Sequence, residues 1–372
     1  MSDRPLRLLG IETSCDDTAC AVVDGEGRVT SSVVASQLDP HRPYGGVVPE
    51  IASREHLRAW PAVYAETLAR AGLELGALDA VAATQGPGLV GSLLVGLSLG
   101  KALAYGLGKP FYAVHHLEGH LYSPFLALHG EVATRVPASF VGLVVSGGHT
   151  ALYRVQESRV TTLAETRDDA LGEAFDKIGK RLGLPYPQGP KVDQLAELGD
   201  PERFALPLPL NTDQSLDFSY SGLKSQTLLV IEELERRGVA TDLGSSASPA
   251  PEVLDLLASF RAAAVKQITS RLKSLARRSP FQHLAVSGGA AANRLLRRAL
   301  AQWAEESQTA LHLVPLAYSG DNAAMIAHAA LIRLRRGDPG DALDVDVFSR
   351  GPLSLCGPHS GIGSPSRAVS SA

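Results

Sequence analysis

Residues 8–23 read LLGIETSCDDTACAVV, and this stretch decides the fold that we expect. Two apolar runs, Leu8 to Ile11 and Ala19 to Val23, flank the small polar residues Thr13 to Asp17. That order predicts a strand, a tight turn and a second strand, followed by another turn at Asp24-Gly25. Hydroxyl and backbone N–H groups in the first turn suit phosphate, and its carboxylates suit a metal ion or a nucleophile. The same residue types also favour turns for purely local reasons.

Two later stretches repeat this arrangement. The apolar runs Phe140 to Val145 and Ala151 to Val155 flank Ser146-Gly147-Gly148-His149-Thr150. Leu284 to Val286 leads through Ser287-Gly288-Gly289-Ala290 into a predicted helix. A chain of 372 residues is long for a single core. The repetition therefore predicts an α/β protein of two related lobes whose turns face one cleft.

The composition is that of a globular chain, with 45% hydrophobic residues, 20% charged residues and a formal net charge of −4. This charge neither demands nor excludes a nucleic-acid partner, because phosphate binding needs only a local basic patch. Cys15, Cys20 and Cys356 give no disulfide framework, which points to a reducing cytoplasm. The apolar stretch 91–107 contains Lys101 and is shorter than the ~20 residues of a membrane span, so we expect a buried helix and no membrane association.

Two histidines four residues apart stand in the stretch His115-His116-Leu117-Glu118-Gly119-His120. On a helix, His116 and His120 share one face, and neutral imidazoles there suit zinc, iron, nickel or copper. With 11 histidines in the chain, chance also produces such pairs, so the spacing alone leaves a packed pair equally open. Glu118 lies ~200° round the helix from His116, at 100° per residue. This position argues against a zinc protease, whose His-Glu-x-x-His signature places the glutamate directly after the first histidine.

Three local expectations concern helix ends and the tail. Pro61 predicts a break or a new helix start within the helical stretch that begins near Ile51. Asp321 precedes a predicted helix and stands where an N-cap is expected. Residues 354–372 are rich in Ser, Gly and Pro and are expected to be disordered.

Nine motifs in one order carry a resemblance to a known family. They are GIETSCDDT (10–18), GGVVPEIASREH (45–56), GPGLVGSLLVGLSLGKALA (86–104), HHLEGH (115–120), VVSGGHT (144–150), DDALGEAFDK (168–177), FSYSGLK (218–224), VSGGAAANRLLR (286–297) and YSGDNAAMIA (318–327). Over about residues 7–353 the chain resembles the universal tRNA threonylcarbamoyladenosine transferase family in its bacterial form, once described as a sialoglycoprotein endopeptidase. It departs from that family at Gln188, where a glycine is common, and at Arg350-Gly351-Pro352-Leu353, where Arg-Trp-Pro-Leu is frequent.

The resemblance implies the actin-like ATPase (ASKHA) fold, with two related lobes of mixed sheets around a ligand cleft. It implies a first lobe of residues 1–114 plus about 322–353, a second lobe of residues 115–321 that carries the metal and ligand turns, and the disordered tail 354–372.

The resemblance also implies a set of site residues. One divalent metal per subunit, Fe2+ with zinc as the alternative, is implied on His116, His120 and Asp321. An essential acid is implied at Asp16. Substrate-binding positions are implied at Val144, Val145, Ser146, Gly147, Gly148, Asp176, Gly189, Asp193 and Asn293.

The implied reaction moves a threonylcarbamoyl group from threonylcarbamoyl-AMP to N6 of the adenosine beside the anticodon, in tRNAs that read codons beginning with A. The implied partners are tRNA, the inactive paralogue TsaB, contacted near Glu50 to Arg70, and the ATPase TsaE, all in the cytoplasm. Candidate phosphate-binding clusters are Arg271 to Arg278, Arg294 to Arg298 and Arg333 to Arg336, unless these are merely solvated helix faces. The rival interpretations are a kinase or ATPase of the same fold and a non-catalytic scaffold; the histidine and aspartate ligand set argues against both.

Overall fold

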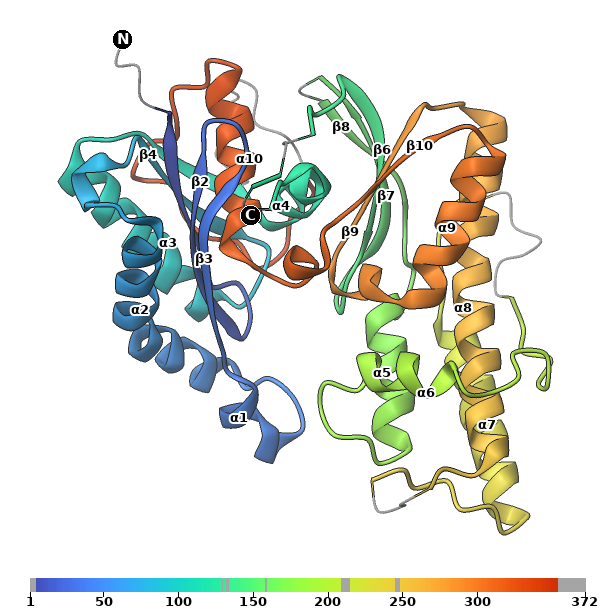
Figure 1. Ribbon diagram of the computed structural model, residues 1–372. Helices are drawn as coiled ribbons and strands as arrows, with labels where there is room; N and C mark the ends of the chain where they lie inside the picture. The colour runs from blue at the N-terminus through green and yellow to red at the C-terminus, as the bar shows by residue number, and fades with distance from the viewer. Residues whose placement is uncertain are drawn as a thin grey trace, which may run out of the picture.

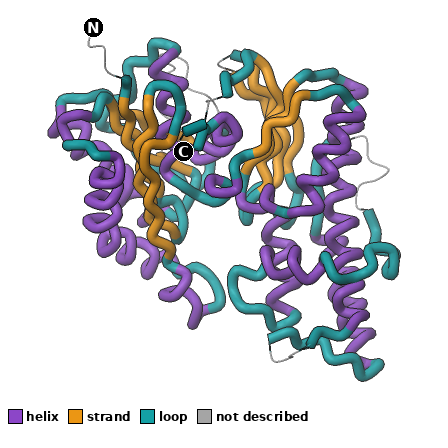
Figure 2. The backbone as a smooth tube through the Cα atoms, in the orientation of Figure 1, coloured by secondary structure: helices purple, strands orange, loops and turns teal. Residues whose placement is uncertain are grey.

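The structure is a computed structural model that describes residues 5–128, 130–131, 134–157, 159–208, 215–244 and 248–353. These residues form two lobes, each built on a five-stranded sheet, with helices on the outer faces of both (Figures 1 and 2). The tail expected to be disordered at 354–372, with Cys356, lies outside the described residues.

The first sheet has the strand order β3-β2-β1-β4-β5. Its strands are β1 (Arg7–Glu12), β2 (Asp17–Asp24), β3 (Val29–Ser36), β4 (Ala80–Gly86) and β5 (Phe111–His115). The first three form an antiparallel meander, and β4 and β5 run parallel to β1. The strand–turn–strand prediction for residues 8–23 is therefore confirmed.

Successive residues of β1 face opposite sides of this sheet, as strand geometry requires. Leu9 and Ile11 pack in a core with helices α2 (Pro49–Ala71) and α3 (Val90–Leu107). Leu8 packs in the other core, which contains α10 (Ala323–Arg335). A Cβ atom on Gly10 would lie 2.2 Å from the carbonyl oxygen of Ala323. The glycine therefore lets the start of α10 rest directly on β1.

The second sheet repeats the first, with the strand order β10-β9-β6-β7-β8. Its strands are β6 (Ser139–Val145), β7 (Thr150–Gln156), β8 (Arg159–Glu165), β9 (His283–Ser287) and β10 (Ala310–Leu313). Again three strands form an antiparallel meander, and two more run parallel to the first of them. Two related lobes with mixed sheets, as expected from the repeated turns, are thus confirmed.

The helices of the second lobe cover the outer side of its sheet, and α4 and α10 lie between the two sheets (Figure 1). The outer helices are α5 (Leu171–Arg181), α6 (Gly189–Ala196), α7 (Ser221–Arg236), α8 (Pro251–Arg278) and α9 (Arg294–Glu306). The helix α4 (His116–Tyr122) follows β5 directly, and a short α1 (Leu38–His41) follows β3. One apolar core runs from β1 through α10 and α4 to the second sheet, so the lobes share a packed interior.

Two local predictions in the first lobe are wrong. Helix α2 runs unbroken through Pro61, because a proline removes one helical hydrogen bond while packing of α2 against β2 and β3 holds the remaining turns. Helix α3 is buried on one face only: Leu97 is 2% exposed, whereas Leu94 is 44% and Tyr105 is 79% exposed. Among the described helices, α3 alone has the length and apolar composition of a membrane span, and 33% of that window is buried.

Candidate metal centre and ligand cleft

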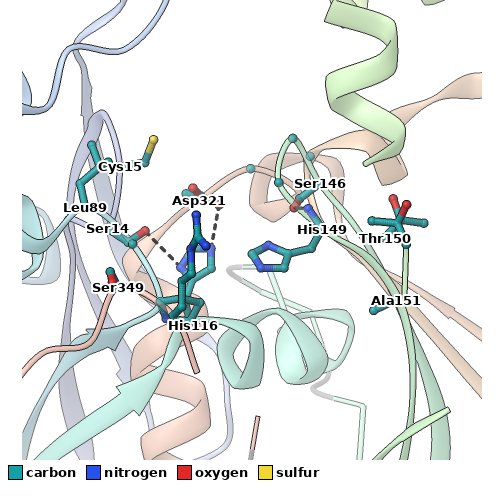
Figure 3. A pocket seen from close by; sticks show the side chains of 18 of the residues that line it. Ser14, Cys15, Leu89, His116, Ser146, His149, Thr150, Ala151, Asp321 and Ser349 are labelled. Carbon is teal, nitrogen blue, oxygen red and sulfur yellow. Dashed lines mark hydrogen bonds and ion pairs between the residues drawn. The ribbon is translucent and has the colours of Figure 1, made fainter. Parts of the chain in front are cut away.

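The ends of parallel strands bring the candidate site together. Because β1, β4 and β5 are parallel, Glu12, Thr84 and His116 meet at one edge of the first sheet. The parallel strands β6 and β9 likewise bring the turns that begin at Ser146 and Ser287 to one edge of the second. Both edges border a single cleft of about 860 Å³ (Figure 3).

Three predicted metal ligands converge on the first-lobe side of this cleft. His116 and His120 lie one turn apart on α4, and Asp321 comes from the loop before α10. Asp321 Oδ1 lies 3.5 Å from His116 Nε2 and 3.2 Å from His120 Nε2. One ligand atom from each residue can be chosen so that all three lie within 4.8 Å of one another. The helical spacing and a distant loop therefore produce one compact group.

The cap of α10 differs from the prediction, and the difference matters for this group. Asn322, not Asp321, is the N-cap, and its side-chain oxygen accepts a hydrogen bond from the backbone N–H of Met325 at 3.0 Å. Because the neighbouring amide satisfies the helix end, the Asp321 carboxylate is left to face the two histidines.

The donor set fits a divalent metal ion. His120 is fully buried; its Nδ1 has no hydrogen-bond partner among the described residues, and its Nε2 lies 3.2 Å from Asp321 Oδ1 without the geometry of a hydrogen bond. A buried polar atom without a partner is costly, and a metal bond would remove that cost. Two imidazoles and one carboxylate on one side of an ion leave further positions open, an arrangement typical of iron(II) sites and accessible to zinc.

A buried glutamate contacts Nδ1 of His116, the ring nitrogen that does not face Asp321. Glu12 is 1% exposed, and its Oε2 lies 3.1 Å from His116 Nδ1. The same carboxylate accepts hydrogen bonds from the backbone N–H of Ser14 and the hydroxyl of Thr84. A carboxylate on the far nitrogen of an imidazole fixes its tautomer and orientation, leaving Nε2 to bind a metal. Glu12 was not among the predicted site residues. A charged residue at the end of a buried strand is a sequence feature that could have identified it.

The charges of His116, Asp321 and Glu12 act on one another. Burial opposes the ionised forms, but the charge of His116 holds the pKa of Asp321 well below its usual range and also lowers the pKa of Glu12. Against the effect of burial, these two carboxylates raise the pKa of His116 well above its usual value. Burial lowers the pKa of His120. A metal ion must therefore displace a proton from His116, so we expect metal affinity to rise with pH.

The other face of α4 carries no ligand. Glu118 is 4% exposed, and burial raises its pKa to about 7, against the opposing charges of Arg333 and Arg336 on the far end of α10. Glu118 does not line the cleft, so it cannot act there as a water-activating base.

On the second-lobe side of the cleft, backbone groups are accessible to a ligand. Ser146, Gly147 and Gly148 line the cleft, and the turn is closed by a 2.8 Å hydrogen bond from Ser146 N to the carbonyl oxygen of His149. Val144 and Val145 have fully buried side chains in β6, so only their backbone groups could meet a ligand.

The remaining predicted ligand residues form two pairs beside the cleft rather than in its lining. Asp176 Oδ1 accepts a 2.7 Å hydrogen bond from Gly189 N at the start of α6. Asp193 Oδ1 accepts a 2.7 Å hydrogen bond from Asn293 Nδ2 and also contacts the buried Arg261. These contacts tie α5, α6, α8 and α9 together, and none of the four paired residues lines the cleft, whereas Tyr186 and Gly289, close to them in the chain, do.

Acidic groups dominate the first turn. Asp16, the predicted essential acid, lines the cleft with Cys15 and Asp17. Burial, with a smaller effect from the charge of Asp16, raises the pKa of Asp17 to about 6. Across the cleft, burial and the nearby His116 and His120 lower the pKa of His149 to about 4, so this imidazole is neutral at pH 7 (Figure 3).

Comparison with known proteins identifies the family. The sequence profile of the family described as tRNA N6-adenosine threonylcarbamoyltransferase matches residues 28–328. The chain belongs to this family. A relative of that name from Syntrophobacter fumaroxidans is 48% identical over 345 residues, which cover 92% of this chain and 99% of the relative. Another, from Sinorhizobium medicae, is 45% identical and covers 94% of this chain and 95% of its own.

Solved structures agree on the fold of this threonylcarbamoyltransferase family member. The crystal structure of T.kodakarensis HypF aligns with a TM-score of 0.56 and 14% identity, over 89% of this chain and 49% of HypF. HypF in a phosphate- and nucleotide-bound form aligns with a TM-score of 0.54 and 12% identity, over 89% of this chain and 46% of that one. At these identities the likeness concerns the fold alone. The predicted actin-like, two-lobed α/β architecture and the family are both confirmed.

Proposed function

We propose that this chain transfers a threonylcarbamoyl group from threonylcarbamoyl-AMP to N6 of the adenosine beside the anticodon, in tRNAs that read codons beginning with A. Family membership supports the reaction class. The observation that carries the site assignment is the convergence of His116, His120 and Asp321 in a cleft wall that His116 and Asp321 line, beside a space large enough for a nucleotide donor.

In this proposal His116, His120 and Asp321 hold one divalent ion, Fe2+ with zinc as the alternative. When bound, such an ion would orient the donor and polarise one of its oxygen atoms. Glu12 keeps the Nδ1 proton of His116 on the side away from the ion, which preserves Nε2 as the ligand atom.

The glycine turns of the second lobe would bind the adenylate. Gly147, Gly148 and Gly289 line the cleft, and no atom lies within 4 Å of where a Cβ would stand on any of them. A ligand can therefore approach their backbone N–H groups closely, as phosphate does in comparable turns. The adenosine would lie toward Tyr186, near the Asp176–Gly189 and Asp193–Asn293 pairs.

The transfer needs one proton acceptor. The N6 nitrogen attacks the carbonyl carbon, and the new C–N bond replaces the C–O bond to phosphate. AMP leaves with that electron pair, and a proton leaves N6. Asp16 lines the cleft and is the group that we assign to orient N6 and accept this proton. Positioning of the two reactants would supply much of the rate.

Burial and ion pairing set aside several of the candidate arginines for tRNA contacts. Arg271 and Arg333 are 6% and 4% exposed, and Arg333 forms ion pairs with Asp338 and Asp341, so both are withdrawn from the candidate clusters. Arg298 is paired with Glu197. Arg335 lies 3.8 Å from Glu26, so the exposed arginines that remain candidates for phosphate contacts are Arg277, Arg278, Arg294 and Arg336.

The outer helices of the first lobe are the surface that we assign to the paralogue TsaB. Leu57 on α2 is 60% exposed, and Leu94 and Tyr105 on α3 are 44% and 79% exposed. Exposed apolar side chains on neighbouring helices are typical of a protein interface. The ATPase TsaE and a cytoplasmic location complete the proposal, which assigns residues 1–114 and 322–353 to the first lobe and 115–321 to the second.

One reconstitution tests this proposal. The purified chain is incubated with TsaB, TsaE, unmodified tRNA, threonine, bicarbonate and ATP in a system that makes the adenylate, and the nucleosides are analysed. Threonylcarbamoyladenosine is expected with the wild type. Its absence, while the adenylate is shown to form, would overturn the proposal. Glu118→Gln is the matched control on α4: it should keep transfer activity, whereas a protease that used this glutamate would lose its activity.

A further inference from the structure

The cleft has an uneven charge that the proposed roles leave unexplained. Its lining contains five acidic residues, and among the described lining residues Arg350 is the sole lysine or arginine. The acidic residues are Asp16, Asp17, Glu165, Asp168 and Asp321. A donor that carries negative groups would be repelled by such a wall, unless a cation meets each of these groups.

Arg350 reaches the cleft on a segment fastened to the first lobe. Phe348 N donates to the carbonyl oxygen of Gln85 at 3.3 Å, and Gln85 Nε2 donates to the carbonyl oxygen of Asp346 at 2.8 Å. The ring of Phe348 lies 5.4 Å from that of His115, and Leu353 is 7% exposed. These contacts, on both sides of Arg350 in the chain, hold its backbone next to the end of β5.

The guanidinium of Arg350 is available to a ligand. Its side chain forms no hydrogen bond or ion pair with any described residue, although acidic groups line the same cleft. Other arginines of the protein that have acidic neighbours are paired, such as Arg181 with Glu235 and Arg261 with Asp193. An unpaired arginine beside an acidic wall is the arrangement expected of a residue that recognises an anion.

The donor of the proposed reaction, on which this inference rests, carries two anionic groups, a phosphate and the carboxylate of its threonyl moiety. The glycine turns of the second lobe and the metal ligands already suit the phosphate. We propose that Arg350 binds the threonyl carboxylate. Its planar guanidinium matches a carboxylate through two parallel hydrogen bonds, and its position on the first lobe separates it from the phosphate-binding turns. Arg350 thereby selects carbamoyl donors derived from amino acids.

The test compares three probes by isothermal titration on the metal-loaded full chain: threonylcarbamoyl-AMP, the same donor with a carboxamide in place of the carboxylate, and AMP. Arg350→Ala is expected to weaken binding of the intact donor on the order of tenfold, to leave AMP unchanged, and to bind the carboxamide as the wild type does. Arg350→Lys should recover part of the loss, because it keeps the charge and loses the paired geometry. Arg236→Ala, an exposed arginine on α7, is the matched control.

Two results would overturn the inference. Unchanged binding of the intact donor by Arg350→Ala would show that the guanidinium makes no contact with it. An equal loss for the donor and for AMP would assign Arg350 to the phosphate instead. Failure of the wild type itself to bind threonylcarbamoyl-AMP, with metal present, would count against the proposed function rather than against the role of Arg350.

Discussion

The two walls of the cleft are built from the same strand–turn–strand unit and offer opposite chemistry. The turn after β1 presents carboxylates and hydroxyls, and Glu12 behind it fixes His116. The turn after β6 presents Gly147 and Gly148, whose backbone is bare. One wall thus presents side chains suited to holding a metal ion or accepting a proton, and the other leaves room for a ligand to lie against the main chain. The repeated strand topology of the two lobes forms the cleft, whereas the residues of each turn decide the chemistry of its wall.

The largest expected effect follows from removing a side chain from the first-lobe wall of the cleft. His116→Ala removes one metal ligand and leaves the Glu12 carboxylate without its partner. We expect loss of bound metal and a fall in transfer rate of roughly 10³-fold. Metal content by mass spectrometry and single-turnover transfer measure the two effects. Full metal occupancy in this variant would show that the ligand assignment is wrong.

The next largest effect concerns the glycine turns that form the second-lobe wall of the cleft. Gly288 has φ +93°, and a Cβ there would lie 2.2 Å from the carbonyl oxygen of Val145. Gly288→Ala should therefore lower the free energy of unfolding by roughly 2–4 kcal/mol, as measured by urea denaturation. Gly289→Ala is the control, since no atom lies within 4 Å of its Cβ position. If both variants lose the same stability, the close approach of the two turns does not explain the glycine.

A smaller effect sharpens the role of the residue behind the metal ligand. Glu12→Gln keeps the size of the side chain and removes its charge, so the orientation of His116 is held less firmly. We expect metal affinity to fall about 10–100-fold while the fold is retained. Competition with a chelator gives the affinity, and circular dichroism checks the fold. An unchanged affinity would reduce Glu12 to a packing role.

The smallest expected effect is a pH dependence of stability that arises from Asp17, on the first-lobe wall of the cleft. The pKa of Asp17 is raised from 3.8 to about 6, so the folded state binds the proton more tightly than the unfolded state does. The stability that this provides is present below pH 3.8 and is lost as the pH rises through about 6. Asp17→Asn should remove the loss and gain roughly 1–2 kcal/mol at pH 8 relative to the wild type. Denaturation at pH 4 and pH 8 tests this, and equal pH profiles would contradict it.

Much of the fold could be predicted because its signals are local. Short apolar runs and small polar turns identified β1, β2, β6 and β7, and their repetition indicated two lobes. The predictions failed where tertiary packing outweighed a local preference. Helix α2 continues through Pro61 because the sheet beneath supports its neighbouring turns, and α3 buries only the face that touches that sheet.

The sequence by itself determined the order of the elements, the glycine-rich turns and the pairing of His116 with His120, since each depends on residues close together in the chain. Only the tertiary structure decided that Asp321 faces these histidines while Asn322 caps α10. It also decided that Glu12 lies behind His116 and that Arg350 enters the cleft. These contacts join residues about 100 to 300 positions apart in the chain. The parallel strands β1, β4 and β5 end at one edge of their sheet, and the C-terminal segment returns to that edge, which brings these residues together.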